Sequence, residues 1–203
     1  KSKEGCEEEL PHFLSAVTTN ETYFFRNEQL WQYLGGELIP AMVASRGPRA
    51  GALRFWSAAS SSGEEAYTLA ILLRETIPDV AKWSITIVAS DISSRMLEKA
   101  RTGVYNDYAV AKTSPALVKK YFEEQGSEYR LKDEARRMVR FQFHNLRDPF
   151  PNGKFDVVFL RNVLMYFDNA MKIRVLANIT DALAPGGRLI VGDVDPIRTI
   201  AEL

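Results

Sequence analysis

Residues 157–160, VVFL, form the feature of this sequence that most constrains its fold. Consecutive apolar residues without alternation are typical of a strand buried on both faces, as in a parallel sheet covered by helices on each side. Other short β-rich runs alternate with helix-like stretches: strands at residues 53–58, 84–90 and 188–192, helices at residues 63–76, 93–101 and 169–183. This alternation predicts an α/β fold with a mostly parallel, doubly wound sheet.

The N-terminal part of the chain and one later stretch lie outside this alternation. Helical patterns at residues 7–17 and 28–46 make residues 1–50 an N-terminal helical segment that leads into the main domain, residues 51–203. A helix at about residues 114–123 is followed by two short alternating runs, at residues 128–132 and 138–144. We expect these runs to form a small antiparallel element, or a third strand with an inserted hairpin, near residues 124–144.

Composition excludes several classes of protein. Lys+Arg and Asp+Glu both count 26, so no overall field would recruit nucleic acid or an anionic membrane. Cys6 is the only cysteine and has no intrachain disulfide partner, which fits a reducing cytoplasm. The apolar runs are far shorter than the roughly 18 residues of a membrane helix. We therefore expect a cytoplasmic protein that recognises its partners through a local site.

The loop after the first strand, residues 57–65, contains only small residues before Glu64 and Glu65. Small side chains let a ligand approach the backbone, but two carboxylates at a helix start would repel the pyrophosphate of a dinucleotide. They suit a cationic ligand without phosphate, such as S-adenosylmethionine, and the absence of G-x-G-x-x-G argues against a nicotinamide-dependent oxidoreductase. The alternative is structural: Ser62 caps the helix and Glu65 completes a capping box.

The loop after the second strand places Asp91 where nucleotide-binding α/β folds hold a ribose through its hydroxyls. The alternative is that Asp91 or Ser93 caps the next helix. Further along, Asn145 offers an amide to an adenine edge and Leu146 can cover the ring. His144 is interpreted as a partly buried hydrogen-bonding residue without a role of its own.

The loop after the buried strand places Arg161 and Asn162 at the mouth of the cleft. Tyr166 lies one helical turn beyond Asn162 and is expected on the same side. Met165 and Phe167 are assigned to the core. The polar and aromatic segment at residues 18–26 precedes all these loops, and burial of its two phenylalanines would leave Arg26 unexplained.

These segments resemble the chemotaxis receptor methyltransferases of the CheR family from about residue 7 to residue 192. The resemblance rests on TNETYFFR (19–26), WSAASSSGEEAYTLA (56–70), ASDISSRMLEKARTGVY (89–105) and FDVVFLRNVLMYFD (155–168). It implies a Rossmann-like class I S-adenosylmethionine-dependent methyltransferase domain at residues 51–203. The implied reaction is methylation of glutamate side chains in the cytoplasmic helical region of chemotaxis-type receptors, without nucleic acid, direct membrane insertion or a metal.

The resemblance also assigns residues. The implied cofactor-binding residues are Asn20, Thr22, Arg26, Glu65, Asp91, Asn145, Leu146, Arg161 and Asn162. Arg26 and Tyr166 match the positions nearest the transferred methyl and are the implied catalytic residues. A glutamate is already ionised at neutral pH, so alignment rather than a strong base would carry the reaction.

The sequence departs from the family in its last part. Asp193 and Asp195 lie where Gly-His-Ser-Glu is expected after the last strand, and the chain ends before a final strand pair. The turn region between Phe122 and Tyr129 lacks a glycine-rich extension, which favours receptor recognition without a tethered peptide. A small-molecule methyltransferase and a non-catalytic S-adenosylmethionine-binding regulatory domain are the alternatives.

Overall fold

The structure is a computed structural model that describes residues 21–46, 52–151, 153–193 and 195. The helix expected at residues 7–17 and the proposed cofactor contact Asn20 lie outside the described residues. The main sheet is parallel throughout and has the strand order β6-β2-β1-β7-β8. Its strands are β1 (Ala52–Ala58), β2 (Ser84–Asp91), β6 (Val139–Phe143), β7 (Phe155–Leu160) and β8 (Leu183–Val191). The predicted α/β class and doubly wound sheet are confirmed.

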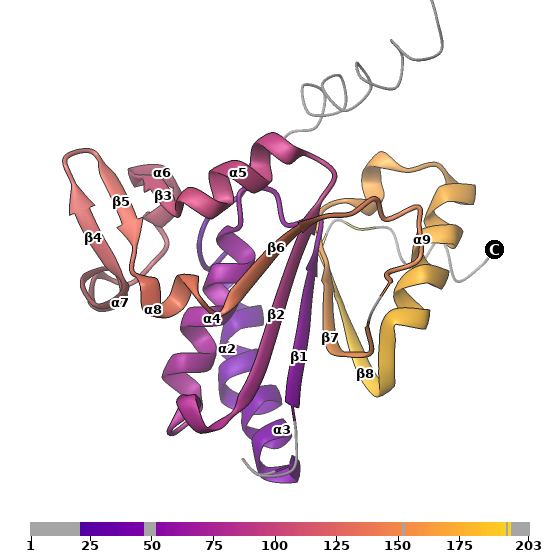
Figure 1. The fold of residues 1–203 in the computed structure, drawn as a ribbon, viewed down its shortest axis with the longest axis horizontal. Coiled ribbons are helices and arrows are strands. Elements are labelled where there is room, and N and C mark those ends of the chain that lie inside the picture. The colour runs from indigo at the N-terminus through magenta and orange to yellow at the C-terminus, as the bar shows by residue number, and fades with distance from the viewer. Residues whose placement is uncertain (1–20, 47–51, 152, 194, 196–203) are drawn as a thin grey trace, which may run out of the picture.

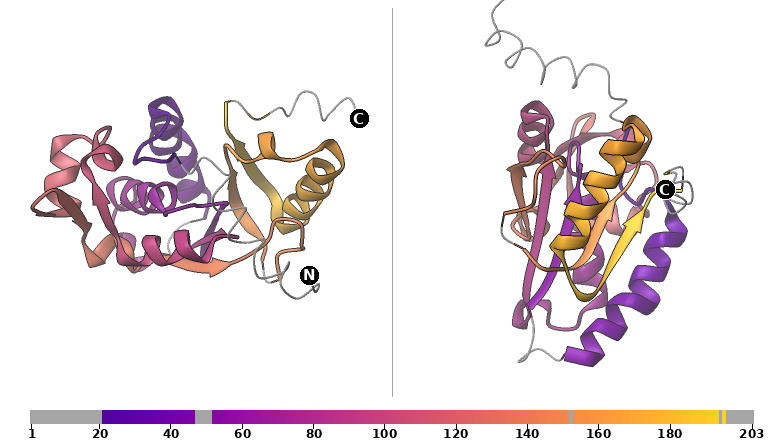
Figure 2. Two further views of the ribbon diagram at one scale, coloured as in Figure 1. Left: turned by 90° about the horizontal axis from the view of Figure 1, so that it is seen from above. Right: turned by 90° about the vertical axis from the view of Figure 1, so that its right-hand side faces the viewer.

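Helices cover both faces of this sheet (Figure 1). One face carries α2 (Glu28–Tyr33), α3 (Ile39–Arg46) and α4 (Glu64–Thr76), and α9 (Asn169–Ala182) covers the other. Figure 2 shows α9 on the opposite side of the molecule from α2 and α3. The helix α5 (Ser94–Thr102) follows β2 and packs beside β2 and β6. None of the described helices is long and apolar enough to cross a membrane.

The buried strand β7 divides the core in two. Val157 and Phe159 pack with α2, α3 and α4, whereas Val158 and Leu160 pack with α9. All four side chains are fully buried, as the VVFL run predicts. Successive side chains of a strand point to opposite faces, so an apolar residue is required at every position when both faces are covered.

The predicted helix over residues 28–46 is one rod, interrupted by a π turn at Leu34–Leu38. The turn ends two residues before Pro40, which has no N–H for the regular helical hydrogen bond. Trp31 and Leu34 are almost fully buried and belong to the same core cluster as Phe159. The described part of the N-terminal helical segment, residues 28–46, is therefore packed onto the sheet.

A small antiparallel sheet, with the order β3-β5-β4, lies beside the main sheet. It consists of β3 (Val104–Asn106), β4 (Phe122–Gln125) and β5 (Glu128–Leu131), accompanied by the short helices α6 (Asp107–Val110), α7 (Pro115–Tyr121) and α8 (Asp133–Arg136). Because β6 pairs with β2, the second of the two expected arrangements holds: a third parallel strand preceded by an inserted hairpin. The sequence pattern did not single out β3, and α7 ends at Tyr121 because Phe122 enters β4.

The strand order reverses at β1, so the chain continues to β2 and β6 on one side of β1 and to β7 and β8 on the other. Loops leaving β1 and β7 diverge at such a point and leave a crevice at the carboxyl ends of the strands. Residues 185–187, PGG, lie in an irregular part of β8, where the register with β7 shifts between Phe155 and Val157.

Candidate cofactor pocket and active site

A pocket of about 560 Å³ lies at this crevice. It has the size of a small-molecule site and is bordered by loops after β1, β2, β6 and β7 together with the segment before α2. Every described residue that the sequence analysis assigned to the site lines it: Thr22, Arg26, Glu65, Asp91, Asn145, Leu146, Arg161, Asn162 and Tyr166. Residues from distant parts of the chain thus face one cavity.

The loop after β1 follows a sharp path that small residues permit. Ala59 and Ser61 have positive φ angles of 62° and 47°, and Gly63 has a φ of 92°. A Cβ atom on Gly63 would lie 2.9 Å from the Phe141 ring, so glycine is required by conformation and by space. The Ser60 N–H donates to the carbonyl oxygen of Ser90 over 2.9 Å and anchors the loop to β2.

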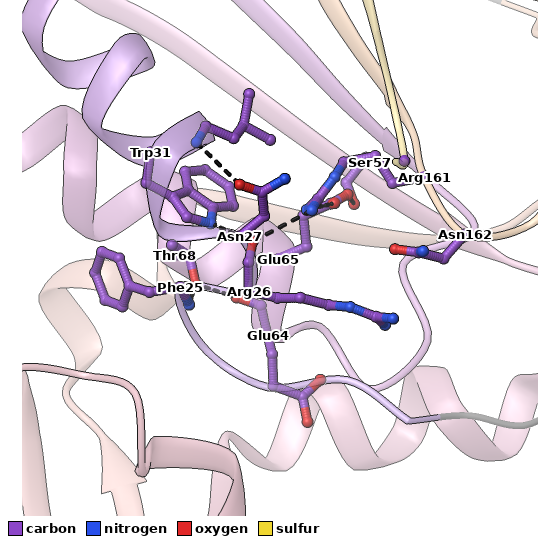
Figure 3. Close-up of polar contacts among 12 residues, drawn as sticks. Phe25, Arg26, Asn27, Trp31, Ser57, Glu64, Glu65, Thr68, Arg161 and Asn162 are labelled. Atoms are coloured by element: carbon purple, nitrogen blue, oxygen red, sulfur yellow. Dashed lines mark hydrogen bonds and ion pairs between the residues drawn. The ribbon is translucent and has the colours of Figure 1, made fainter. Parts of the chain in front are cut away.

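Glu64 and Glu65 point in different directions (Figure 3). Glu65 lines the pocket, while Glu64 is 1% exposed and receives the Ser62 hydroxyl at its carboxylate. Burial raises the pKa of Glu64 to about 7. The interpretation that both carboxylates face the ligand is therefore wrong for Glu64. The capping box is also wrong, because Gly63 is the N-cap residue and no side chain caps α4.

A buried ion pair joins two walls of the pocket. Arg161 Nη1 lies 2.9 Å from Glu65 Oε2, and the two side chains are 5% and 15% exposed. The Ser57 hydroxyl donates to Glu65 Oε1 over 2.7 Å. Arg161 Nη2 also donates to the backbone carbonyl of Arg26, which accepts the Trp31 indole N–H as well (Figure 3). Arg161 thereby holds α4, its own loop and the segment before α2 in one arrangement.

Asp91, at the end of β2, is held by backbone groups. Its Oδ2 accepts the Ser61 N–H and its Oδ1 accepts the Ser93 N–H, both over 2.8 Å. Burial raises the pKa of Asp91, and the backbone hydrogen bonds oppose that shift. Ser93, not Asp91, caps α5 by accepting the Met96 N–H. Each carboxylate oxygen retains a lone pair for a second donor, such as a ligand hydroxyl.

The wall after β6 combines an amide, an apolar side chain and an imidazole. Asn145 and Leu146 line the pocket, and Leu146 also packs against the core beneath α9. His144 is 9% exposed, lines the same wall and contacts the rings of Trp56 and Phe150 edge-on. Burial lowers the pKa of His144, which keeps its imidazole neutral at pH 7. The sequence analysis missed its place in the pocket.

The loop after β7 brings Asn162 and Tyr166 to the pocket through a short 3-10 helix, Leu164–Tyr166. Tyr166 is 46% exposed and lies at the surface. Met165 is 42% exposed and lines the pocket too, so its assignment to the core is wrong. Phe167 contacts both the pocket and the core beneath α9. A 3-10 helix has three residues per turn, so consecutive side chains of Leu164–Tyr166 point in different directions around it, and Met165 points outward.

The segment before α2 closes the remaining side. Phe24 is fully buried against Tyr105 and Phe122 of the antiparallel sheet, and its N–H donates to Ala109. Arg26 extends beside the pocket, where its Nη1 donates to the carbonyl oxygen of Glu21 over 2.7 Å. The buried phenylalanine anchors the segment, and this leaves the arginine free to face the cavity.

Several buried polar atoms at the pocket have no hydrogen-bond partner among the described residues: Ser60 Oγ, Ser61 Oγ, His144 Nε2 and Arg161 Nε. Buried polar groups are normally paired, so such a cluster around one cavity fits a polar occupant. Asp91, Glu65 and the apolar Leu146 suit a diol, a cation and an aromatic ring respectively. The residues present therefore fit S-adenosylmethionine. Among the described residues, no cluster suited to hold a metal ion is found.

Comparison with known proteins agrees with this reading of the pocket. The family described as "CheR methyltransferase, SAM binding domain" matches residues 20–202. A chemotaxis protein methyltransferase of Vibrio parahaemolyticus is 40% identical over 195 residues, which cover 93% of this chain and 69% of that protein. Chemotaxis protein methyltransferase 1 of Pseudomonas aeruginosa is 36% identical over 195 residues, with 93% and 70% covered.

Among solved structures, a TehB-like SAM-dependent methyltransferase from Corynebacterium glutamicum has a TM-score of 0.45 and 16% identity, over 93% of this chain and 70% of that one. The family match spans nearly all of the described residues, including each strand of the sheet and each wall of the pocket. The chain therefore belongs to the CheR methyltransferase family and is an S-adenosylmethionine-dependent methyltransferase.

Proposed function

We propose that the chain transfers a methyl group from S-adenosylmethionine to glutamate side chains in the cytoplasmic helical region of chemotaxis-type receptors. The names of its relatives as chemotaxis protein methyltransferases support this acceptor. The protein would act in the cytoplasm, with neither nucleic acid nor membrane insertion involved. The observation that carries the proposal is that Arg26 adds a cation to a pocket whose own carboxylates are already paired.

The cofactor would lie along the pocket with its adenosine at one end and its methionine part at the other. Asp91 would accept the ribose hydroxyls, while Asn145 and Leu146 would contact the adenine. Glu65 would face the amino group, because it lines the pocket from the first turn of α4. Thr22, Arg161 and Asn162, with Asn20 beyond the described part, would complete the methionine end.

Each carboxylate that lines the described pocket already has a hydrogen-bond or ion-pair partner. The Asp91 carboxylate is held by backbone N–H groups, and that of Glu65 by Arg161. Glu21 receives the hydroxyl of Tyr108. The neutral His144 keeps an unpaired Nε2, but it lies in the wall after β6, which we assign to the adenine. An amine or alcohol acceptor would need to lose a proton, whereas a glutamate is already ionised at neutral pH. The pocket therefore suits a carboxylate acceptor.

Arg26 supplies a cation that can attract and orient such a carboxylate. Tyr166 has an exposed hydroxyl that can align the acceptor at the surface, where a receptor helix must approach. When bound, S-adenosylmethionine supplies an activated methyl group: a carboxylate oxygen forms the new C–O bond as the S–C bond breaks. The negative carboxylate and the positive sulfonium become a neutral ester and a neutral thioether. Alignment of the two groups is then the main contribution of the protein.

The test is transfer of labelled methyl from S-adenosylmethionine to receptor cytoplasmic fragments from the same organism by the full-length protein. Carboxyl methyl esters release methanol in base, whereas N-methyl groups do not. We expect alkali-labile label on the receptor, and its loss in Arg26→Ala. Binding of S-adenosylhomocysteine by both proteins is the control that the pocket is intact.

Three results would contradict the proposal. Label on the receptor that resists base would place the methyl on nitrogen and exclude glutamate as the acceptor. Cofactor binding without any receptor label, together with labelling of small carboxylic acids or amines, would indicate a small-molecule methyltransferase. Cofactor binding without turnover on either class would indicate a regulatory cofactor-binding domain.

A further inference from the structure

Asp195 lies just beyond β8 and is 9% exposed. Its carboxylate accepts three backbone N–H groups: Oδ2 bonds those of Asn162 at 2.7 Å and Gly192 at 2.9 Å, and Oδ1 bonds that of Leu164 at 3.1 Å. Two of these donors belong to the pocket loop after β7, which lies 31 and 33 residues earlier in the sequence. A buried carboxylate with this many backbone donors fixes both segments against each other.

The loop that Asp195 holds is strained at one of its pocket residues. Asn162 has a positive φ of 56°, a conformation that residues other than glycine adopt at a cost. The hydrogen bond from Asn162 N to Asp195 acts at the strained residue itself. The bond from Leu164 N acts at the start of the 3-10 helix Leu164–Tyr166, which presents Tyr166. Asp195 therefore fixes the direction of two side chains that line the pocket.

Gly192 makes this contact possible. A Cβ atom on Gly192 would lie 2.7 Å from Asp195 Oδ2 and 2.8 Å from Asn162 N. Both distances are shorter than non-bonded atoms tolerate, so any larger residue would push the carboxylate away from the loop. The lack of space for a side chain at Gly192 and the hydrogen bonds to Asp195 both belong to this contact.

A second carboxylate of this segment reaches the opposite wall. Asp193 Oδ2 accepts a hydrogen bond from Asn27 Nδ2 over 2.8 Å, and Asn27 is the residue next to Arg26. Asn27 is also the N-cap of α2, where its Oδ1 accepts the Leu30 N–H and its φ is 67°. Asp193 is exposed, so its hydrogen bond to Asn27 contributes less than the bonds of the buried Asp195 to the loop after β7. The segment after β8 thus contacts the walls that carry Tyr166 and Arg26.

We propose that Asp195 is a positioning residue for methyl transfer, which sets Asn162 and Tyr166 relative to the cofactor, and that Asp193 supports it by aligning the Arg26 wall. Neither carboxylate lines the pocket, so both act through other residues. This proposal rests on the proposed function, since it concerns the same acceptor site. Its effect should appear in turnover more than in cofactor affinity. Tyr166 depends on the 3-10 helix that Asp195 holds, whereas Asn162 is one of several proposed cofactor contacts and Asp91 is held by the N–H groups of Ser61 and Ser93.

The experiment uses the full-length protein with the variants Asp195→Asn, Asp195→Glu and Gly192→Ala. Asn has one carbonyl oxygen and cannot accept at both of the positions that the two carboxylate oxygens serve. We expect kcat for receptor methylation to fall roughly 10- to 100-fold in Asp195→Asn and Gly192→Ala, as for small misplacements of a reacting group. Asp195→Glu keeps both acceptor oxygens and should recover part of this loss. Asp193→Ala should lower kcat less than Asp195→Asn.

Asp79→Asn is the matched control, because Asp79 is an exposed aspartate that pairs with Lys82 before β2, away from the carboxyl ends of the strands. Amide hydrogen exchange at Asn162 and Leu164 gives a readout that is independent of activity. Both amides should exchange faster in Asp195→Asn than in the unmodified protein and in Asp79→Asn. The dissociation constant for S-adenosylhomocysteine and the melting temperature are measured on the same samples.

The proposal is overturned if the unmodified protein methylates the receptor and Asp195→Asn does so at the same kcat as Asp79→Asn. It is also overturned if the loss of activity equals the unfolded fraction of the variant, because the folded molecules would then be fully active. Faster exchange at Asn162 and Leu164 with a reduced kcat in the folded protein supports it. If the unmodified protein itself transfers no methyl to the receptor, the proposed function fails, and unchanged exchange at these amides would then separately overturn the positioning role.

Discussion

Arg161 and Glu65 form a buried ion pair, with Nη1 2.9 Å from Oε2, that connects the loop after β7 to the first turn of α4. Arg161 also bonds the carbonyl of Arg26, so the pair contributes to the geometry of three pocket walls. An interaction of this kind holds the shape of the site before any ligand enters.

Removing the cation of this pair should destabilise the protein. In Arg161→Met the free energy of unfolding should fall by about 3 kcal/mol, because the Glu65 carboxylate stays buried without its partner. Arg137→Met is the matched control, since Arg137 pairs with Asp133 at the surface, and it should cost less than about 1 kcal/mol. Urea unfolding of both variants measures the difference. Equal losses of unfolding free energy in the two variants would show that the buried pair stabilises the protein no more than the surface pair does.

The buried Glu64 predicts an unusual pH dependence of stability. Burial raises its folded-state pKa from 4.5 to about 7, so the folded protein favours the protonated form. The stability that this group contributes is present in full below about pH 4.5 and is lost as the pH rises through 7. Glu64→Gln mimics the protonated form at every pH. As the pH rises from 4.5 to 8, the unfolding free energy of the variant should increase relative to that of the unmodified protein, by on the order of 3 kcal/mol in total.

Urea unfolding of the unmodified protein and of Glu64→Gln at pH 5 and pH 8 checks this prediction. The quantity compared is the difference between the two proteins at each pH, which cancels the titration of all other groups. A difference that stays constant between the two pH values would mean that Glu64 titrates in its ordinary range.

Tyr166→Phe should separate turnover from folding. Because Tyr166 is 46% exposed, loss of its hydroxyl should change the unfolding free energy by no more than about 0.5 kcal/mol. The kcat for receptor methylation should fall roughly 10-fold if the hydroxyl aligns the acceptor. Tyr33→Phe removes a comparably exposed hydroxyl from α2 and should leave kcat unchanged. Full activity of Tyr166→Phe would exclude a role for the hydroxyl.

Asp91→Asn should weaken cofactor binding. One hydrogen bond to a charged group is worth roughly 10- to 100-fold in affinity, so the dissociation constant for S-adenosylhomocysteine should rise by that factor. Calorimetry measures it directly. Burial raises the pKa of Asp91. As the solution is acidified, the affinity of the unmodified protein should therefore begin to fall at a higher pH than it would with an ordinary aspartate. An affinity of Asp91→Asn equal to that of the unmodified protein would remove Asp91 from the ribose site.

Much of the architecture could be predicted because its signals are local. The VVFL run, the alternation of strands and helices and the small-residue loop before α4 each reflect the period or conformation of a short stretch of chain. The carboxyl ends of parallel strands meet at one edge, so residues such as Asp91 and Arg161 could be placed together without coordinates. The strand β3 was missed because three residues, Val104–Asn106, are too few to show a period.

At the pocket, the sequence could not show in which directions adjacent side chains point. Glu64 and Glu65 have the same chemistry and the same loop context, yet one is buried beneath the pocket and the other lines it. On a helix, consecutive side chains point about 100° apart, and only the position of α4 against the sheet decides which of them faces the ligand. Met165 was misjudged for the same reason, since its exposure depends on neighbours far away in the sequence. His144 is buried as expected, but its place in the pocket was not evident from the sequence.

The sequence by itself determined the fold class, the family and the loops that carry the site, because periodicity and contiguous motifs are properties of the chain alone. Only the tertiary structure decided how the walls of the pocket are held. Asp195 contacts Asn162, Asp193 contacts Asn27, which is 166 residues away, and Arg161 contacts Glu65. Hydrogen bonds and ion pairs form between groups that the packing of the sheet and its helices brings within about 3 Å, and no local pattern encodes that distance.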